Sequence, residues 1–106
     1  MTIAEVSRAY DISADTLRYY ERVGLLPSIG RTSGGIRNYS EEDCRWVEYI
    51  KCMRSAGVSV ETLVEYVALF YQGNETIQAR KNLLLEQRAQ IAARIDGLQA
   101  VLARLD

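Results

Sequence analysis

The C-terminal third of the chain repeats large aliphatic side chains every seven residues, and this repeat restricts the fold more than any other feature. The repeating positions are Ile77, Leu84, Ile91, Leu98 and Leu105. A second line lies four residues after each of these; it is polar in its first half and apolar at Ile95 and Leu102. Two such lines form the seam of a coiled coil. At about 1.5 Å per residue, a helix over residues 73–106 would exceed about 40 Å, too long to bury its seam on the residues before it.

The seam therefore predicts a partner helix, and we expect a homodimer. A chain of 106 residues is one ordinary domain with a limited core, and domains of this size often depend on a partner. The alternative is that the leucines from Leu83 onward pack back on the same chain. The residues expected to join the dimer are Ile77, Leu84, Ile91, Ile95, Leu98, Leu102 and Leu105.

Two short helices are expected at the N-terminus. Thr2 and Glu5 have the spacing of a capping box, so a helix begins there. Ser13 is a good N-cap for a second helix over residues 14–22, which Gly24 ends. The short turn between the two helices is typical of a helix-turn-helix, and a plain helical hairpin is the alternative.

The residues after Pro27 predict a small β-hairpin. Pro27 prevents the second helix from continuing, because it has no backbone N–H to donate. Residues 28–31 and 36–39 read as two short strands, and the glycine-containing stretch 32–35 reads as the turn between them. A short helix followed by such a hairpin is the outline of a winged helix-turn-helix. The expected fold is therefore mainly α, with a small β-hairpin wing and a long dimerisation helix.

Positive charge is concentrated in the second helix and the hairpin. Residues 16–39 hold four arginines and one acid, a local charge of +3, whereas the whole chain carries −1. A clustered basic patch is compatible with nucleic-acid binding even on an acidic protein. We therefore expect residues 1–72 to form a DNA-binding domain and residues 73–106 to form the dimerisation helix.

Three further helix starts follow the hairpin. Ser40 precedes three acids and is expected to cap a helix that ends near Ser55. Ser59 is expected to cap a helix over residues 60–71, and Asn74 is expected to cap the long final helix. The helix after Ser40 has an apolar arc that is expected to face the core: Trp46, Tyr49, Ile50 and Met53.

Composition and motifs argue against several other classes of protein. No apolar run approaches the roughly 20 residues of a transmembrane helix, and no signal peptide begins at Met1, so we expect a cytoplasmic protein with no membrane partner. Two cysteines and no histidine are too few for a structural zinc site, and no cofactor is expected. An enzyme is disfavoured because the chain has no histidine and no phosphate-binding loop. A coiled-coil interaction module that never touches DNA is the remaining alternative.

Several motifs together resemble the MerR family of bacterial transcription regulators, over essentially the whole chain. They are IAEVSRAYDIS, TLRYYERVGLLP, the wing RTSGGIRNYS, and EEDCRWVEYIKCMRSAG. The resemblance implies homodimers, joined by an antiparallel coiled coil, that bind a dyad-symmetric promoter site in double-stranded DNA. It also implies activation by bending and untwisting an over-long promoter spacer, so that RNA polymerase can use both promoter elements.

The resemblance further implies which residues contact DNA. They lie on the second helix and on the wing: Arg18, Tyr19, Tyr20, Arg31, Arg37 and Tyr39. Arginine and tyrosine donors suit phosphate oxygens, whereas Thr16 and Asp15 are the candidates for contacts with base edges. Arg22 is left unassigned, because an ion pair with Asp11 or Asp15 explains it equally well.

One cysteine carries a further implication. The stretch from Ile50 to Gly57 resembles the branch of the family called AdhR-like or NmlR-like, which is associated with aldehyde, nitrosative and other electrophile stress and has a lone cysteine here. The resemblance therefore implies that Cys52 senses a small electrophile. Lys51, Arg54 and Arg45 lie near it on the helix, and nearby cations favour the reactive thiolate.

Covalent sensing has alternatives that the sequence leaves open. Cys52 read without the resemblance is a small buried hydrophobe, and the regulator then responds to a non-covalent effector or to none. Cys44 is a poorer candidate for modification, because it follows three acids that disfavour a thiolate. Eight residues of continuous helix hold the two cysteines about 12 Å apart, beyond the reach of a disulfide.

Overall fold

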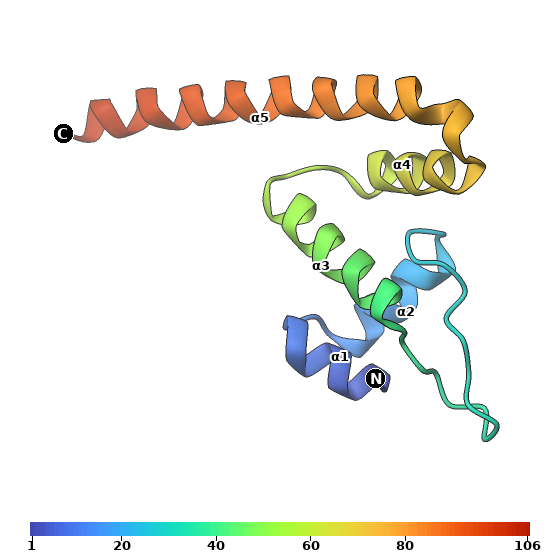
Figure 1. The fold of residues 1–106 in the computed structure, drawn as a ribbon. Helices are drawn as coiled ribbons and strands as arrows, with labels where there is room; N and C mark the ends of the chain where they lie inside the picture. Colours follow the sequence, from blue (N-terminus) through green and yellow to red (C-terminus); the bar gives the residue numbers. More distant parts are fainter. The chain divides into compact units, whose positions relative to one another are not determined.

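The structure, a computed structural model, describes all residues from Met1 to Asp106 and comprises two compact units, Met1–Ala68 and Leu69–Asp106. Helices dominate both units, as Figure 1 shows, which confirms the expected mainly α fold. In chain order the elements are α1 (Ile3–Tyr10), α2 (Ala14–Arg22), α3 (Glu41–Ser55), α4 (Val60–Gln72), the 3-10 helix η1 (Asn74–Thr76) and α5 (Ile77–Leu105).

Local side-chain contacts fix the beginnings of α1 and α2. The Thr2 hydroxyl accepts from the backbone N–H of Glu5 at 3.2 Å, and the Glu5 carboxylate accepts from the Thr2 N–H at 2.8 Å. α1 ends at Asp11, whose φ of 53° turns the chain through the left-handed region. Ser13 then caps α2 by accepting from the backbone N–H of Thr16 at 3.1 Å. The two helices therefore begin as the sequence predicts.

The first unit has one apolar core that gathers residues from its helices and turns. α1 contacts both α2 and α3, so the three helices share this core. On α3, Trp46 and Ile50 are buried as expected, while Tyr49 and Met53 are half-buried. The most completely buried side chains of the unit are Val6, Leu17, Leu25, Leu26, Val47, Ile50 and Val58.

The wing is present, but its expected strands are reduced to one antiparallel bridge between Arg31 and Arg37. Its turn is closed by two backbone hydrogen bonds, from Gly35 to the Thr32 carbonyl at 2.9 Å and from Thr32 to the Ile36 carbonyl at 2.8 Å. Gly35 adopts a φ of 81°, which suits a residue without a Cβ. An isolated pair of short strands is marginal in water, so the hairpin does not extend into a regular ladder.

The return side of the wing is held against the beginning of the chain. The Met1 nitrogen donates to the Tyr39 carbonyl at 2.8 Å, and the Tyr39 N–H donates to the Met1 carbonyl at 2.7 Å. Immediately afterwards Ser40 caps α3, accepting from the Asp43 N–H at 3.1 Å while the Asp43 carboxylate accepts from the Ser40 N–H at 2.9 Å. The junction between the wing and α3 is therefore held by the hydrogen bonds of Tyr39 to Met1 and of Ser40 to Asp43.

The expected cap at Asn74 is wrong. Asn74 begins the 3-10 helix η1, and α5 begins after Thr76, whose side chain caps no backbone N–H. The buried Thr76 hydroxyl lies instead 2.6 Å from the Leu69 carbonyl oxygen and 2.9 Å from that of Gly73, and it accepts from Arg80 Nε at 3.1 Å. This cluster joins the end of α4 to the start of α5. Its hydrogen bonds occupy the Thr76 hydroxyl, which therefore does not cap α5.

The long helix α5 spans 29 residues without a break, and its apolar seam is open in the single chain. Of the seven seam residues named above, six are exposed, with Leu98 at 69% and Leu105 at 79%, while Ile91 is half-buried. The leucines of the second half are therefore not buried within the second unit itself. None of the helices is both long enough and apolar enough to cross a membrane.

Removal of the cap of α3 tests this account of the helix starts. We expect Ser40→Ala to lower the free energy of unfolding by about 1 kcal/mol, because the Asp43 N–H loses its acceptor. Ser33→Ala, at an exposed position in the wing turn, is the matched control and should change it by less than about 0.5 kcal/mol. Urea unfolding followed by circular dichroism at one protein concentration measures both, and equal effects would count against the cap.

Candidate nucleic-acid interface

The outer face of α2 carries three predicted contact residues that are exposed or half-buried. The Arg18 guanidinium pairs with the Asp15 carboxylate at 3.0 Å, one turn earlier on the same helix. The Thr16 hydroxyl lies 2.8 Å from the Ser13 hydroxyl oxygen, so it is oriented by the helix cap. The Tyr19 ring is exposed, and α2 thereby presents a hydroxyl, a guanidinium and a phenol within two turns.

Arg22 lies beside this face and has a role that the sequence did not predict. Its guanidinium stands 5.5 Å from the centre of the Tyr19 ring, a cation–π distance. Asp15 pairs with Arg18 instead of with Arg22. Arg22 therefore contributes positive charge to the same surface and supports the Tyr19 ring.

An ion pair attaches the wing to α2. Arg37 Nε donates to Glu21 Oε1 at 3.1 Å, and the two side chains are only 25% and 22% exposed. Ion pairs that are shielded from water are screened less by salt than those on an open surface. Further out on the wing, the Arg31 guanidinium donates to the Gly35 carbonyl at 3.0 Å, so this arginine closes the turn while remaining exposed.

Tyr39 lies behind this ion pair, next to the arginines of both elements. Burial raises the pKa of the Tyr39 phenol, and the negative charge of Glu21 raises it further, while Arg37 and Arg18 oppose the shift. The side chain is 3% exposed, and its hydroxyl is buried without a hydrogen-bond partner in the chain. The fold therefore brings predicted contacts from α2 and from the wing into one cluster.

The seven predicted DNA contacts fall into two groups. Tyr20 and Tyr39 are buried, at 9% and 3% exposure, and lie beneath the surface. The others are exposed or half-buried, and they are Thr16, Arg18, Tyr19, Arg31 and Arg37. Contact with DNA stays a prediction for all seven, and the second group forms the accessible part of the candidate interface.

The two cysteines lie on one face of α3 but differ in exposure. Cys52 is exposed, whereas Cys44 is buried. Cys52 opens into a cavity of about 340 Å³ between α1 and α3, whose lining residues are Ala9, Tyr10, Glu48, Lys51, Cys52 and Ser55. Of the three cations expected near Cys52, only Lys51 lines this cavity. Arg54 instead donates to the Val58 carbonyl at 2.9 Å.

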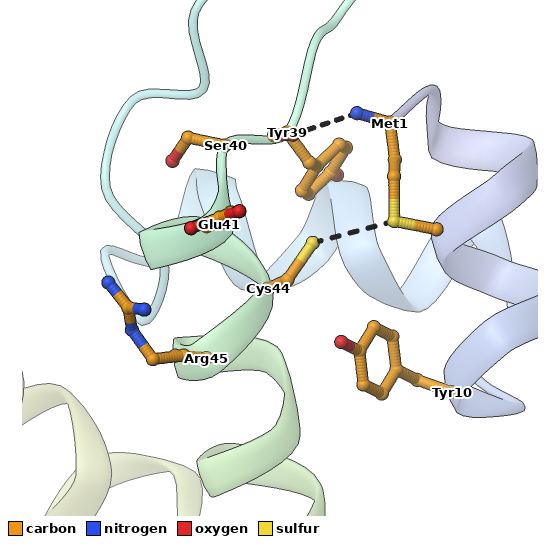
Figure 2. A pocket seen from close by; sticks show the side chains of 7 residues that line it. All are labelled: Met1, Tyr10, Tyr39, Ser40, Glu41, Cys44 and Arg45. Atoms are coloured by element: carbon orange, nitrogen blue, oxygen red, sulfur yellow. Dashed lines mark hydrogen bonds between the residues drawn. The ribbon is translucent and has the colours of Figure 1, made fainter.

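A second cavity, of about 400 Å³, holds Cys44 and is drawn in Figure 2. The Cys44 thiol lies 3.8 Å from the Met1 sulfur, and Tyr10 points its hydroxyl toward Cys44 across the cavity. Burial raises the pKa of the Tyr10 phenol, and Cys44 and Glu48 raise it further. Tyr10 therefore contributes to the walls of both cavities, a role that no sequence pattern revealed. The sequence offered one related signal: Cys44, Glu48 and Cys52 are spaced four residues apart, which places their side chains near one another along α3.

Comparisons with known proteins identify the fold. The model of the MerR HTH family regulatory proteins matches residues 1–69, and a second model, described as MerR, DNA binding, matches residues 44–106. The chain belongs to the MerR family. This is the family of transcriptional regulators that the sequence motifs resembled.

Two transcriptional regulators are similar to the chain over most of its length. The chain is 53% identical to the HTH-type transcriptional regulator AdhR of Bacillus subtilis, over 86% of the chain and 65% of AdhR. It is 30% identical to an uncharacterised HTH-type transcriptional regulator of Haemophilus influenzae, over 99% of the chain and 78% of that protein. The chain thus spans just under two thirds of the length of AdhR.

Two solved structures share the fold over nearly the whole chain. A MerR family transcriptional regulator from Listeria monocytogenes superposes with a TM-score of 0.95 at 47% identity, over the entire chain and 80% of that protein. HiNmlR, a MerR family regulator that lacks the sensor domain and is bound to promoter DNA, superposes with a TM-score of 0.90 at 31% identity. That match covers 98% of the chain and 82% of HiNmlR.

The buried hydroxyl of Tyr39 makes a prediction about stability. We expect Tyr39→Phe to raise the free energy of unfolding by about 1 kcal/mol, because it removes a buried polar group that has no partner. Tyr19→Phe, on the exposed face of α2, should change it by less than about 0.5 kcal/mol. Thermal unfolding measures both variants. A loss of stability in Tyr39→Phe would show that the hydroxyl is hydrogen-bonded after all.

Proposed function

We propose that this MerR-family chain acts as a homodimer on dyad-symmetric promoter DNA, with α2 and the wing as its DNA-contacting surface. The observation that carries the proposal is the Glu21–Arg37 ion pair, which joins the two basic elements into one surface. The net charge of +3 over residues 16–39 gives that surface the sign that phosphates require. HiNmlR, which shares the fold, is bound to promoter DNA in its crystal structure.

The exposure of each residue suggests its role at the proposed interface. Arg18, Arg31 and Arg37 offer guanidinium donors to phosphate oxygens, which set the register of the protein on the duplex. Thr16 is the candidate for a base edge, because its hydroxyl stands near the N-terminal end of α2, the end that enters the major groove in helix-turn-helix proteins. Tyr19 adds a hydroxyl donor from the exposed face of α2.

The two buried tyrosines are proposed to act from the second layer of the interface. Tyr20 lies on α2, and its buried ring holds this helix, the proposed recognition helix, in place. The unpartnered hydroxyl of Tyr39 reaches a phosphate oxygen only after a small movement of the wing, which is opposed by the two backbone hydrogen bonds between Tyr39 and Met1. Such a movement gives the hydroxyl the acceptor that it lacks in the free chain.

The apolar seam of α5 supports a dimer. Its residues, from Ile77 to Leu105, are exposed or half-buried in one chain, and a second copy in antiparallel orientation buries them. We assign DNA binding to residues 1–72 and dimerisation to residues 73–106. A dimer places two α2 helices on two half-sites, which agrees with a dyad-symmetric operator.

Activation is proposed to work through the shape of the DNA. A dimer that holds two half-sites in a fixed relation bends and untwists the spacer between promoter elements, and the cost depends on the deformability of that spacer. RNA polymerase then engages both elements. The two DNA-binding lobes are residues 1–72 of each copy in the dimer. If they have two stable relative orientations, an effector that favours one of them switches the promoter.

The proposed switch is modification of Cys52 by a small electrophile. The exposed thiol opens into a cavity of about 340 Å³, where a small electrophile can reach it. With an aldehyde, the sulfur bonds to the carbonyl carbon and the carbonyl oxygen takes up a proton. The similarity to AdhR supports this branch of the family. A non-covalent effector, or none, is the alternative, and it predicts that Cys52→Ser leaves the response intact.

DNA binding is tested with arginine variants and a duplex that the protein selects from a random pool. We expect Arg18→Gln and Arg37→Gln each to weaken binding and to reduce the slope of log Kd against log salt by about one, because each removes one phosphate contact. Fluorescence anisotropy at several salt concentrations gives both quantities. Unchanged affinity and slope in both variants would refute the assigned surface.

A matched control separates contact from positioning at Arg37. Glu21→Gln removes the ion pair but keeps the guanidinium, so it should weaken binding without changing the salt slope. If Arg37 only positions the wing, the two variants will behave alike.

The double variant Leu98→Asp, Leu102→Asp should sediment as a monomer and lose tight binding to the two-half-site duplex, because charge opposes burial of the seam.

Thiol sensing makes its own prediction. We expect iodoacetamide to modify Cys52 at least about tenfold faster than Cys44, because only Cys52 is exposed. Peptide mass analysis over a range of pH follows the two residues separately. The modified protein should bind the selected duplex with altered affinity, and Cys52→Ser should remain unaffected by the reagent. An altered affinity in treated Cys52→Ser would move the response to another site.

A further inference from the structure

The side chain of Tyr10 separates the two cavities that flank the ridge of α3. It lines the cavity of Cys52 together with Glu48, and it lines the cavity of Cys44 from the other side. Figure 2 shows Tyr10 projecting from the end of α1 toward α3, with its hydroxyl directed at Cys44. Of the five other residues that line the cavity of Cys52, only Ala9 and Tyr10 come from outside α3. Within this cavity, a group attached to Cys52 therefore faces α1 at Ala9 and Tyr10.

Tyr10 is also the last residue of α1, where α1 turns into the recognition helix. The next residue, Asp11, has a φ of 53°, and its backbone N–H bonds to the Ser7 carbonyl. Ile12 donates to the same carbonyl at 3.2 Å, and Ser13 is already the cap of α2. No loop is available between Tyr10 and α2 to absorb a displacement. A shift of the end of α1 is therefore transmitted to α2.

We propose that modification of Cys52 acts on DNA recognition through Tyr10, which serves as the positioning residue between the thiol cavity and α2. This inference rests on the proposed electrophile switch and names its route. A group on the Cys52 sulfur fills the cavity and displaces the Tyr10 ring, the end of α1 moves away from α3, and α2 moves with it. The route lies within one DNA-binding unit, so each lobe responds to its own cysteine.

The size of the cavity sets the class of effective electrophile. A cavity of about 340 Å³ that is open to solvent accepts a very small group without contact with its far wall. Larger adducts reach more of the cavity wall, of which Tyr10 is part. The response is therefore expected to depend on the bulk of the adduct as well as on the chemistry of its attachment.

The experiment uses three reagents of increasing size on the full chain. Methyl methanethiosulfonate leaves a methylthio group with loss of methanesulfinate, iodoacetamide leaves a carbamidomethyl group with loss of iodide, and N-ethylmaleimide adds across its double bond. Mass analysis confirms that Cys52 alone is modified. We expect Kd for the selected duplex to change little with methylthio and about tenfold with N-ethylmaleimide. An equal change with all three reagents would overturn the proposal.

Variants of Tyr10 provide the second arm. In Tyr10→Ala the ratio of modified to unmodified Kd should fall to within about twofold of one for every reagent, while Tyr10→Phe keeps the ring and the wild-type ratios. Arg8→Ala, at an exposed position on the same helix, is the matched control and should behave as wild type. If Tyr10→Ala responds fully, Tyr10 is not the route, and if it does not fold, the reagent series on the wild-type chain decides.

A readout without DNA distinguishes failure of this route from failure of the proposed switch. Hydrogen exchange of the peptides covering residues 3–22 should rise on modification of Cys52 in the wild-type chain and in Tyr10→Phe, and not in Tyr10→Ala. A rise in exchange without any change in DNA affinity would refute the electrophile switch but keep the coupling through Tyr10. No rise in exchange with N-ethylmaleimide would refute the coupling itself.

Discussion

The candidate interface depends on one shielded ion pair, between Arg37 of the wing and Glu21 of α2. The wing contributes a single backbone bridge of its own, so it lacks the ladder that normally gives a hairpin a fixed shape. The 3.1 Å contact supplies a tertiary attachment, and the buried Tyr39 ring lies behind it. The position of the distal turn, with Arg31, follows from this attachment. A candidate surface built in this way has a tertiary contact at its base, while its tip has only contacts within the turn.

The sequence predicted those parts of the fold that are set by neighbouring residues. Thr2, Ser13 and Ser40 cap helices as expected, because the hydroxyl and the N–H that it accepts from lie three residues apart. The prediction for Asn74 failed because a residue two positions later, Thr76, is drawn into a buried cluster with carbonyls of α4. Local propensity contains no information about that cluster.

The candidate sites show the same division between local and tertiary information. Motif and charge were sufficient to propose Arg18 and Arg37 as DNA contacts, since both lie in a basic segment that resembles a known family. Neither feature revealed that Tyr39 is buried, or that Tyr10 lines the cavity of Cys52, because these facts depend on how α1 and the wing pack against α3. Residues far apart in sequence lie close together there, and no periodic pattern in the sequence predicts their contact.

The open seam of α5 has a consequence for the life of the protein in a cell. A chain with exposed leucines such as Leu98, Leu102 and Leu105 carries the kind of surface that chaperones and proteases recognise. On the proposal of a dimer, we expect chains that have not found a second copy to be removed preferentially, while paired chains survive. Turnover would then set a lower limit on the concentration at which the protein accumulates, and a small change in its synthesis would produce a larger change in its abundance.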